Sequence, residues 1–459
     1  MVNRLFFREL ISKKNLILIL SFSLLMFESM TALTFLDARS AVSASESAVS
    51  LHYADYLFFL AGYLLYAVLG RQLSSESKEN IFIAFSLFFL MTIILSQSDN
   101  ISGAFFITSF LATFFLGFLG SIFYSVMAVN LKGSLCTGGI LAIAQSLAIL
   151  LQYAAMQANL VYPFLIASGV LSLCIAVLLH KQQMITFGLN AAEGAKEKEN
   201  SNLRTEVITA AVVLICLEFI SGFNDGFYVR LFSAGQIDLY GSMRLILILG
   251  FLLAGWLADI RHRKYFAVSV ICVYMISVFA PILLEEQQHQ YLNLGLMYVY
   301  LSFLVIYFNV TFFDIAADSR NPEFYAPLGR IIDIIASILF SLIAVTVNTY
   351  LVLAIYLVLL VIAWSIQIWK AQHVDKKETV NESRSIDDFI QLYALTERES
   401  EIARQVLLKG ESIKQLSQEL FISERVLYRH LSHIYEKTGT DSRMSLMIKY
   451  RTYLSQHQN

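Results

Sequence analysis

Residues 255–264 have the sequence Gly-Trp-Leu-Ala-Asp-Ile-Arg-His-Arg-Lys and follow a run of apolar residues centred near Ile248. The glycine permits two helices to approach closely, because it has no side chain to hold them apart. Asp259, Arg263 and Lys264 come directly after the apolar run. Charged side chains at this place can pair with opposite charges or with the ends of neighbouring helices. The stretch therefore predicts a helix that ends in a charged loop contacting other helices.

The rest of the chain has the composition of a membrane protein. Of its 459 residues, 57% are hydrophobic and only 15% are charged, whereas soluble domains have about 25% charged residues. Apolar runs of about 20 residues, each long enough to cross a bilayer, recur along most of the chain. We count twelve such spans, with centres near Leu25, Leu60, Phe88, Leu116, Ala144, Ser168, Cys216, Ile248, Tyr274, Leu304, Ala336 and Leu357.

Basic residues are distributed unevenly among the connections between these spans. With the N-terminus inside, the inside segments hold Arg4, Arg8, Lys13, Lys14, Arg71, Lys78, Lys132, Lys181, Lys196, Lys198, Arg204, Arg261, Arg263, Lys264 and Arg320, whereas the outside segments hold Arg39 and Arg230. Cytoplasmic loops carry the excess of Lys and Arg in membrane proteins. The distribution therefore predicts a multi-pass protein of the bacterial cytoplasmic (inner) membrane, with both termini in the cytoplasm.

One long polar connection divides the spans into two sets of six. It covers residues 181–204, and its segment 191–202 is charged and rich in small residues. Such a composition is typical of a solvated linker. We therefore expect a membrane domain over residues 1–370, built from a first half at 1–180 and a second half at 205–370.

Two short internal matches support a duplication of the six-helix unit. Residues 62–65 match residues 250–253, and residues 27–30 match residues 217–220. The offsets of 188 and 190 residues agree with each other. Together they predict a 6+6 pseudo-repeat, an organisation that many transporters have.

The charged loop at residues 255–264 resembles the G-x-L-A-D-x-x-x-R-[RK] loop of the major facilitator superfamily, which recurs at equivalent places in both halves of its members. The equivalent loop of the first half, residues 70–75, lacks the aspartate, and this departure counts against transport activity. The resemblance covers roughly residues 1–370. It implies an all-α membrane domain of twelve helices that closes with a gate on the cytoplasmic side.

Four ionisable residues fall within the outer and central parts of the spans, namely Glu28, Glu218, Asp225 and Arg244. Charges within a bilayer are costly and mark functional sites. Glu28 and Glu218 occupy matching positions of the two halves, and Asp225 shares a helix face with Glu218. We expect the four to border a cavity for a small-molecule ligand. An internal ion-pair network that holds the two halves together is an equally weighted alternative.

A second set of residues is expected at the cytoplasmic gate. Arg330 and Asp333 are three residues apart on one helix, which favours a structural pair over a ligand contact. The whole predicted gate set consists of Gly255, Asp259, Arg263, Lys264, Asp314, Arg330 and Asp333.

The chain becomes polar after Lys370, and we expect a tether at residues 371–394, followed by a separate domain at 395–459. Thr396 and Glu399 form a capping box. Apolar periodicity and turn residues predict a first helix that ends at Lys409, a second at about 412–420, a third from 424 to about 438 that ends at Gly439, and a fourth from Asp441. Two short helices followed by a longer exposed one are typical of a helix-turn-helix.

Residues 395–453 resemble the LuxR-type DNA-binding domain, with matches at 395–399, 410–423 and 430–443 spread at fixed spacing over the domain. The resemblance implies that the third helix enters the major groove and that the fourth supports a homodimer on DNA. It places Tyr428, Arg429 and Ser432 at base-reading positions and Lys414, Ser423, Arg425 and Lys437 near phosphates. A bidentate contact to guanine is the role expected for Arg429.

The sequence departs from that family at Val426, Leu427 and Tyr428, where Thr-Val-Lys is usual. A phosphate-binding hydroxyl and a base-reading lysine are therefore missing. Between Leu395 and Tyr453 there are ten Lys and Arg against eight Asp and Glu, a net charge of +2. Because phosphate neutralisation supplies much of the binding energy, we expect weak binding by a monomer. A helical protein-binding module that has lost DNA binding is the alternative.

No catalytic motif stands out, and we expect neither an enzyme nor a cofactor. The four cysteines, Cys136, Cys174, Cys216 and Cys272, have no metal-binding spacing and fall in or beside apolar runs, so we expect no disulfide and no metal site. We favour a membrane-bound one-component transcription regulator that senses a small molecule. A transporter that reports its own flux through the tail, and a transporter whose tail binds a protein partner, remain alternatives.

Overall fold

The structure is a computed structural model. It describes residues 9–40, 45–96, 103–182, 185, 200–263, 266–283, 290–343, 349–409, 413–443, 445–447, 449–450 and 453. Throughout these ranges the regular structure is helical and contains no strand. The chain forms two compact units, Met1–Gln367 and Ile368–Asn459.

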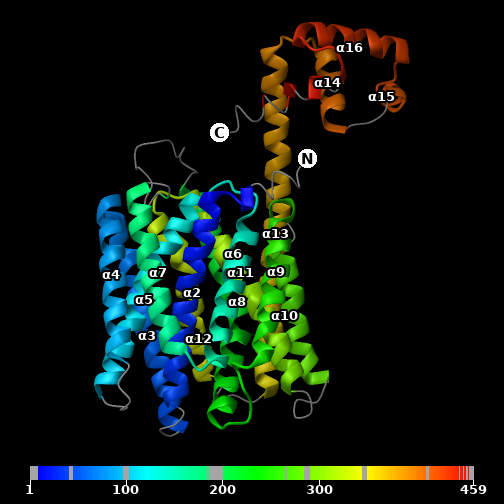
Figure 1. Cartoon of the computed structure of the whole chain (residues 1–459). Helices are drawn as coiled ribbons and strands as arrows, with labels where there is room; N and C mark the ends of the chain where they lie inside the picture. The colour runs from blue at the N-terminus through cyan, green and yellow to red at the C-terminus, as the bar shows by residue number, and fades with distance from the viewer. Residues whose placement is uncertain are drawn as a thin grey trace. The chain divides into compact units, whose positions relative to one another are not determined.

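Among the described residues, twelve long helices belong wholly or in part to the first unit, and each contains one of the twelve predicted centres. They are α2 (Lys13–Ser40), α3 (Ser45–Leu69), α4 (Ser75–Leu95), α5 (Gly103–Asn130), α6 (Thr137–Gln157), α7 (Val161–Gln182), α8 (Asn200–Ser233), α9 (Ile246–Asp259), α10 (Phe266–Leu283), α11 (Gln290–Ala317), α12 (Pro322–Ile343) and α13 (Thr349–Leu392) (Figure 1). Within the described ranges, nine helical segments are long and apolar enough to cross a membrane, and three more are apolar but shorter. The expectation of an all-α, twelve-helix unit is confirmed.

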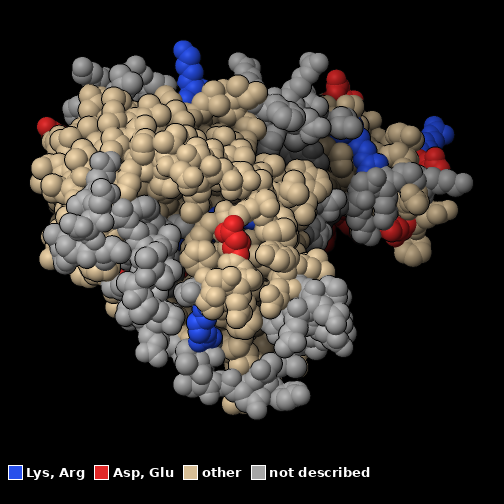
Figure 2. All heavy atoms as spheres, turned by 60° about the horizontal axis from the view of Figure 1, so that its bottom comes forward, with Lys and Arg blue, Asp and Glu red and all other residues tan. Residues whose placement is uncertain are grey.

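The outer surface of this unit is apolar. Leu249 is 70% exposed and Trp256 is 60% exposed, and they belong to a large set of exposed leucine, isoleucine, valine and phenylalanine side chains on the same helices. Soluble monomers do not expose apolar surface on this scale. Figure 2 brings forward the lower end of Figure 1, where the described residues are mostly uncharged and charged side chains are isolated. The chain is therefore a multi-pass membrane protein.

The packing of the helices repeats between the two halves. Helix α2 packs on α6 as α8 packs on α12, and α3 packs on α5 as α9 packs on α11. Between the halves, α6 contacts α9 and α12 contacts α3. Because α6 corresponds to α12 and α3 to α9, these two contacts are the same interface formed twice. The arrangement is the 6+6 pseudo-repeat that the sequence predicts.

Glycines make the interface between α6 and α9 possible. A Cβ atom added to Gly255 would lie 2.5 Å from the carbonyl oxygen of Gly138, and one added to Gly138 would lie 2.6 Å from the carbonyl oxygen of Gly255. Real Cβ atoms do not approach backbone this closely, so a larger residue at either position would force the two helices apart. Close helix approach through small residues is common in membranes.

The second unit is a small helical domain with its own hydrophobic core. It contains α14 (Glu397–Lys409), α15 (Ile413–Glu419) and α16 (Glu424–Thr438), and residues 443, 445–447 and 449–450 are helical beyond them. Gly439 ends α16 in the left-handed conformation, with φ of 62°, as the sequence predicts. Buried apolar residues from all of these helices form the core, among them Val406, Leu416, Leu431 and Leu446.

The segment expected to be a tether, residues 371–394, is helical as far as Leu392, where helix α13 ends. Its residues Ile386, Phe389 and Ile390 are buried in the core of the second unit. Their spacing of three and four residues places them on one face of the helix. The polar residues around them hide this short periodicity when the segment is judged as a whole.

Candidate ligand cavity and nucleic-acid interface

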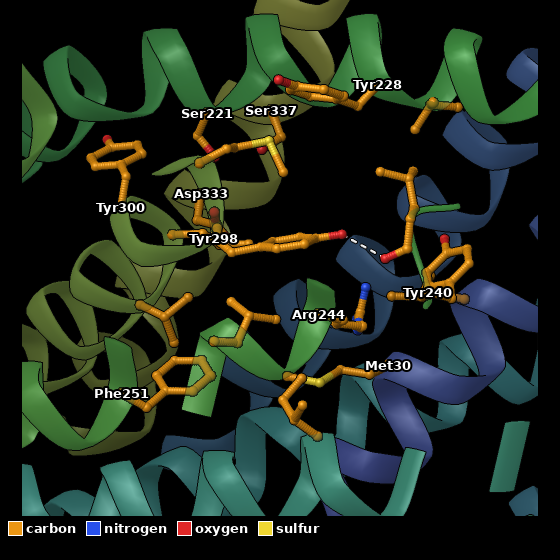
Figure 3. Close-up of a pocket in the computed structure, with 18 of the residues that line it drawn as sticks. Met30, Ser221, Tyr228, Tyr240, Arg244, Phe251, Tyr298, Tyr300, Asp333 and Ser337 are labelled. Carbon is orange, nitrogen blue, oxygen red and sulfur yellow. Dashed lines mark hydrogen bonds between the residues drawn. The ribbon is translucent and has the colours of Figure 1, made fainter. Parts of the chain in front are cut away.

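A cavity of about 210 Å³ lies between the two halves of the first unit. The first half contributes Met30, Leu33, Tyr56 and Ile149, and the second half contributes the rest of the lining. Most of the lining is apolar or aromatic, and its polar members are Ser221, Tyr228, Tyr240, Arg244, Tyr298, Tyr300, Arg330, Asp333 and Ser337 (Figure 3). A concave, mostly apolar space with a few convergent polar groups is the usual form of a small-molecule site.

Arg244 is the expected cavity residue that lines this space. It lies in a short 3-10 helix, Ser242–Leu245, directly before α9. Its guanidinium lies 5.0 Å from the centre of the Tyr240 ring, and its side chain points towards the hydroxyl end of Tyr298 (Figure 3). The Arg244 Nε is buried and has no hydrogen-bond partner. Among the described residues, no carboxylate forms an ion pair with it.

Arg330 and Asp333 also line the cavity and form an ion pair with each other across one turn of α12. Their expected place was the cytoplasmic gate, and the structure differs on this point. Helix α12 begins at Pro322, so Arg330 lies about two turns inside the helix. The sequence pattern located the pair correctly on one helix but misjudged its depth.

The two matching glutamates do not line the central cavity. Glu28 is buried within the first half, where it borders a much smaller pocket and accepts a hydrogen bond of 2.9 Å from the Ser172 hydroxyl. Glu218 is fully buried, and Asp333 and Arg330 act on it electrostatically. Arg244 forms an ion pair with neither glutamate. The described residues therefore do not form the single ion-pair network that was the alternative expectation. The side chain of Asp225 lies outside the described residues.

Four of the expected gate residues come together at the end of α9. The Asp259 carboxylate accepts hydrogen bonds from the backbone N–H groups of Gly138, at 2.8 Å, and Gly139, at 2.7 Å. It therefore caps the N-terminus of α6, where a negative charge is stabilised by the helix dipole. Arg263 forms an ion pair with Asp314 of α11. Gly255 provides the close approach described above, and Lys264 lies outside the described residues.

The structure adds a gate contact that the sequence analysis missed. Lys78, in the first turn of α4, forms a buried ion pair with Glu323, in the first turn of α12, and the two side chains are only 5% and 7% exposed. This pair joins the two halves at the interface equivalent to that of Asp259, where the first-half loop has lost its aspartate. The sequence contained a signal for this contact, because both residues are charged and each lies at the start of an apolar span.

The second unit presents α16 as an exposed helix. The Ser423 hydroxyl accepts a hydrogen bond of 3.4 Å from the backbone N–H of Val426 and caps the helix. Tyr428 is 56% exposed, and Arg425, Arg429 and Ser432 are exposed as well. These are the residues expected to face DNA. Lys414 lies on α15, and its side chain is outside the described residues.

Lys437 has a structural role instead of a free charge. Its ammonium group forms an ion pair of 2.6 Å with Glu399 and donates a hydrogen bond of 3.3 Å to the carbonyl oxygen of Ala394. Glu399 in turn accepts a hydrogen bond of 2.8 Å from the N–H of Thr396, which completes the predicted capping box. The phosphate contact of Lys437 stays a prediction, and the structure gives its ammonium group partners within the domain.

The pKa of Glu399 reflects these contacts. Burial acts to raise the pKa, but the hydrogen bond from Lys437 and the hydrogen bonds from Thr396 outweigh it, and the pKa is held below its ordinary value of 4.5. The charged form of Glu399 is therefore the form that the folded domain stabilises.

An exposed aromatic residue in the turn was also missed. Phe421 lies between α15 and α16, is 95% exposed, and has a positive φ of 52°. Its position beside the N-terminus of α16 adds it to the candidate nucleic-acid interface.

Comparison with known proteins supports this division of the chain. Residues 393–450 match the family described as "Bacterial regulatory proteins, luxR family". The chain is similar in structure to FucP, a Major Facilitator Superfamily transporter in the outward conformation, with 13% sequence identity and a TM-score of 0.50 over 77% of this chain and 98% of that one. A point variant of the E. coli fucose:proton symporter FucP gives 14% identity and a TM-score of 0.50 over 78% and 97%. No curated protein matches the chain significantly in sequence.

The chain thus has a membrane unit whose fold is similar to that of a Major Facilitator Superfamily transporter, followed by a segment, residues 393–450, that matches the luxR family of bacterial regulatory proteins.

Proposed function

We propose that this protein is a membrane-bound, one-component transcription regulator of the bacterial cytoplasmic membrane, with both termini in the cytoplasm. A small molecule binds in the cavity between the two halves and shifts the equilibrium between conformations of the membrane domain. The C-terminal domain binds a promoter as a homodimer through α16. The proposal involves no enzymatic reaction.

The observation that carries the proposal is the presence, in one chain, of a cavity lined from both halves and of the exposed helix α16 bearing Arg429. A ligand that contacts both halves binds two arrangements of those halves with different affinity, which is the requirement for any population shift. Helix α13 contributes residues to both units, and it is the part of the chain through which we propose that the signal passes. The excess of basic residues on one set of connections supports the orientation.

The first test is DNA occupancy across the genome in cells that contain the intact protein. We expect discrete peaks, and we expect Arg429→Ala to abolish them, because a bidentate arginine–guanine contact contributes about 1–3 kcal/mol to discrimination between bases. Arg71→Ala is the matched control, because Arg71 is also exposed but belongs to the first unit. Peaks that persist unchanged in Arg429→Ala would contradict the assignment of α16 as the recognition helix.

A transporter with a regulatory tail gives a different result. Uptake of a ligand into proteoliposomes, without any peak of DNA occupancy, would replace the proposed function with that one.

A further inference from the structure

The charges of the central cavity are not balanced. Arg330 and Asp333 neutralise each other, and Glu218 is fully buried outside the lining. Arg244 is left as the one lining cation that no described carboxylate pairs with, and its Nε has no hydrogen-bond partner. The Tyr240 ring, 5.0 Å from the guanidinium, compensates only part of the positive charge of this partly buried side chain. A charge that is partly removed from water and has no carboxylate partner is unfavourable, so the cavity favours an occupant that carries the opposite charge.

We infer that the ligand is a small organic anion, a carboxylate on a short apolar body, and that Arg244 is the group that binds its carboxylate. This inference rests on the proposed use of the cavity as the ligand site.

Three features specify this chemistry. A guanidinium presents a planar set of donors that matches the two oxygens of a carboxylate. A single unpaired cation balances one negative charge, which favours a monoanion over a dianion. The walls of the cavity include Leu33, Leu247 and Met297, and these apolar side chains favour an organic body over an inorganic anion.

The size of the cavity limits the size of the ligand. Its volume of about 210 Å³ is below the roughly 300–1,000 Å³ of pockets that hold drug-sized molecules. The hydroxyl oxygen of Tyr298 lies on the same side as the Arg244 guanidinium (Figure 3) and accepts a hydrogen bond from it, which helps to orient the guanidinium in the cavity. Its own hydroxyl hydrogen is donated to the carbonyl oxygen of Leu239, which fixes the ring in this position.

The test measures thermal unfolding of the full-length protein in lipid nanodiscs. The probes are the sodium salts of acetate, propionate, butyrate and benzoate, each compared with its neutral amide and with sodium chloride at equal ionic strength. We expect the carboxylates to raise the unfolding midpoint and the amides to leave it unchanged. Apparent affinity should rise about fourfold for each added CH₂ group along the aliphatic series.

Substitutions identify the site. Arg244→Gln should weaken carboxylate binding tenfold or more, because hydrogen bonds to charged groups contribute strongly. Arg244→Lys keeps the charge without the planar donors and should give an intermediate affinity. Arg71→Gln makes the same change at an exposed arginine and should bind as the native protein does. The unfolding midpoint of each variant in chloride alone shows whether it folds.

Three results would overturn the inference: equal shifts with carboxylates and amides, undiminished binding by Arg244→Gln, or no shift with any carboxylate. The measurement contains no DNA, so it separates the inference from the proposed function. Carboxylate binding at Arg244 without any change in promoter occupancy would leave the inference standing and reject the sensor. Ligand-dependent occupancy with no carboxylate binding at Arg244 would reject the inference alone.

Discussion

At the scale of single residues, three charged side chains of the described part of the chain have a defined partner. Asp259 has the N-terminus of α6, Lys78 has Glu323, and Lys437 has Glu399. A buried charge that loses its partner is far more destabilising than a surface charge that does so. The contribution of each residue therefore depends on its surroundings, and this can be tested in the C-terminal domain by pH.

Glu399→Gln should destabilise the C-terminal domain, because glutamine retains the hydrogen bond from Thr396 but loses the ion pair with Lys437. The expected loss at pH 7 is about 1 kcal/mol in the free energy of unfolding. The folded pKa of Glu399 is lowered, so its contribution is present above the unfolded pKa of about 4.5 and is lost as pH falls through the folded value. The difference between native and variant domain should accordingly shrink below pH 4.5.

Urea unfolding of residues 368–459 at pH 7 and at several pH values below 4.5 measures this difference. Glu401→Gln is the control on the same helix, because Glu401 pairs with Arg398 at the surface and its side chain is 50% exposed. Exposed pairs contribute little, so this variant should stay within about 0.5 kcal/mol of the native domain. Equal losses from both substitutions would contradict the role given to Glu399.

At the scale of helices, the contact between α6 and α9 joins the two halves through a carboxylate on two backbone N–H groups. The equivalent interface is formed by α3 and α12, and beside it Lys78, at the start of α4, pairs with Glu323 of α12. The acid that the first-half loop lacks is thus supplied from the opposite helix. Both contacts hold the halves together at the same end of the helices, and both must separate if that end opens.

Asp259→Asn should loosen the contact between α6 and α9, because the amide is uncharged and can accept through only one atom. Cys136 lies directly before α6, and its side chain is fully buried. It therefore reports separation of the two helices through its reaction with a thiol reagent. In a protein with Cys174→Ala, Cys216→Ala and Cys272→Ala, we expect Asp259→Asn to increase the labelling rate of Cys136 severalfold.

Asp318→Asn serves as the control for that experiment, because Asp318 is a half-exposed acid near the same end, 3.9 Å from Lys132. Its labelling rate should equal that of the parent. Labelling of Cys136 that is insensitive to Asp259→Asn would show that the carboxylate does not hold the interface.

At the scale of the whole molecule, local patterns in the sequence were sufficient to predict the positions of the helices but not to predict which residues line the cavity. Runs of apolar residues locate each span, and the αL preference of Gly439 locates the end of α16, since both depend on near neighbours in the chain. Which residues face one cavity depends on how distant helices pack. Glu28 and Arg244 are equivalent as isolated charges in apolar runs, yet one borders a small pocket of the first half and the other lines the central cavity.

Aromatic residues illustrate the same limit. Tyrosine and phenylalanine are plentiful along all spans, so nothing distinguishes Tyr298 in the sequence from tyrosines that only fill the core. The short apolar pattern at Ile386, Phe389 and Ile390 was missed for a related reason. It forms half of a core whose other half, from α14 to Tyr450, follows later in the chain.

The division into two units gives the last prediction. Residues 368–459 have their own core and a recognition helix, so the fragment should bind the promoters occupied by the intact protein. Its net charge is only +1, because residues 368–459 carry 14 basic and 13 acidic side chains. Few phosphate contacts imply weak binding by a monomer and a shallow dependence on salt.

We expect the fragment to bind with lower affinity than the intact protein. We also expect its binding to be unaffected by every carboxylate that alters occupancy by the intact protein. Fluorescence anisotropy with labelled promoter DNA at two salt concentrations measures both properties. A fragment that still responds to those carboxylates would place the ligand site in the DNA-binding domain and remove the membrane cavity from the mechanism.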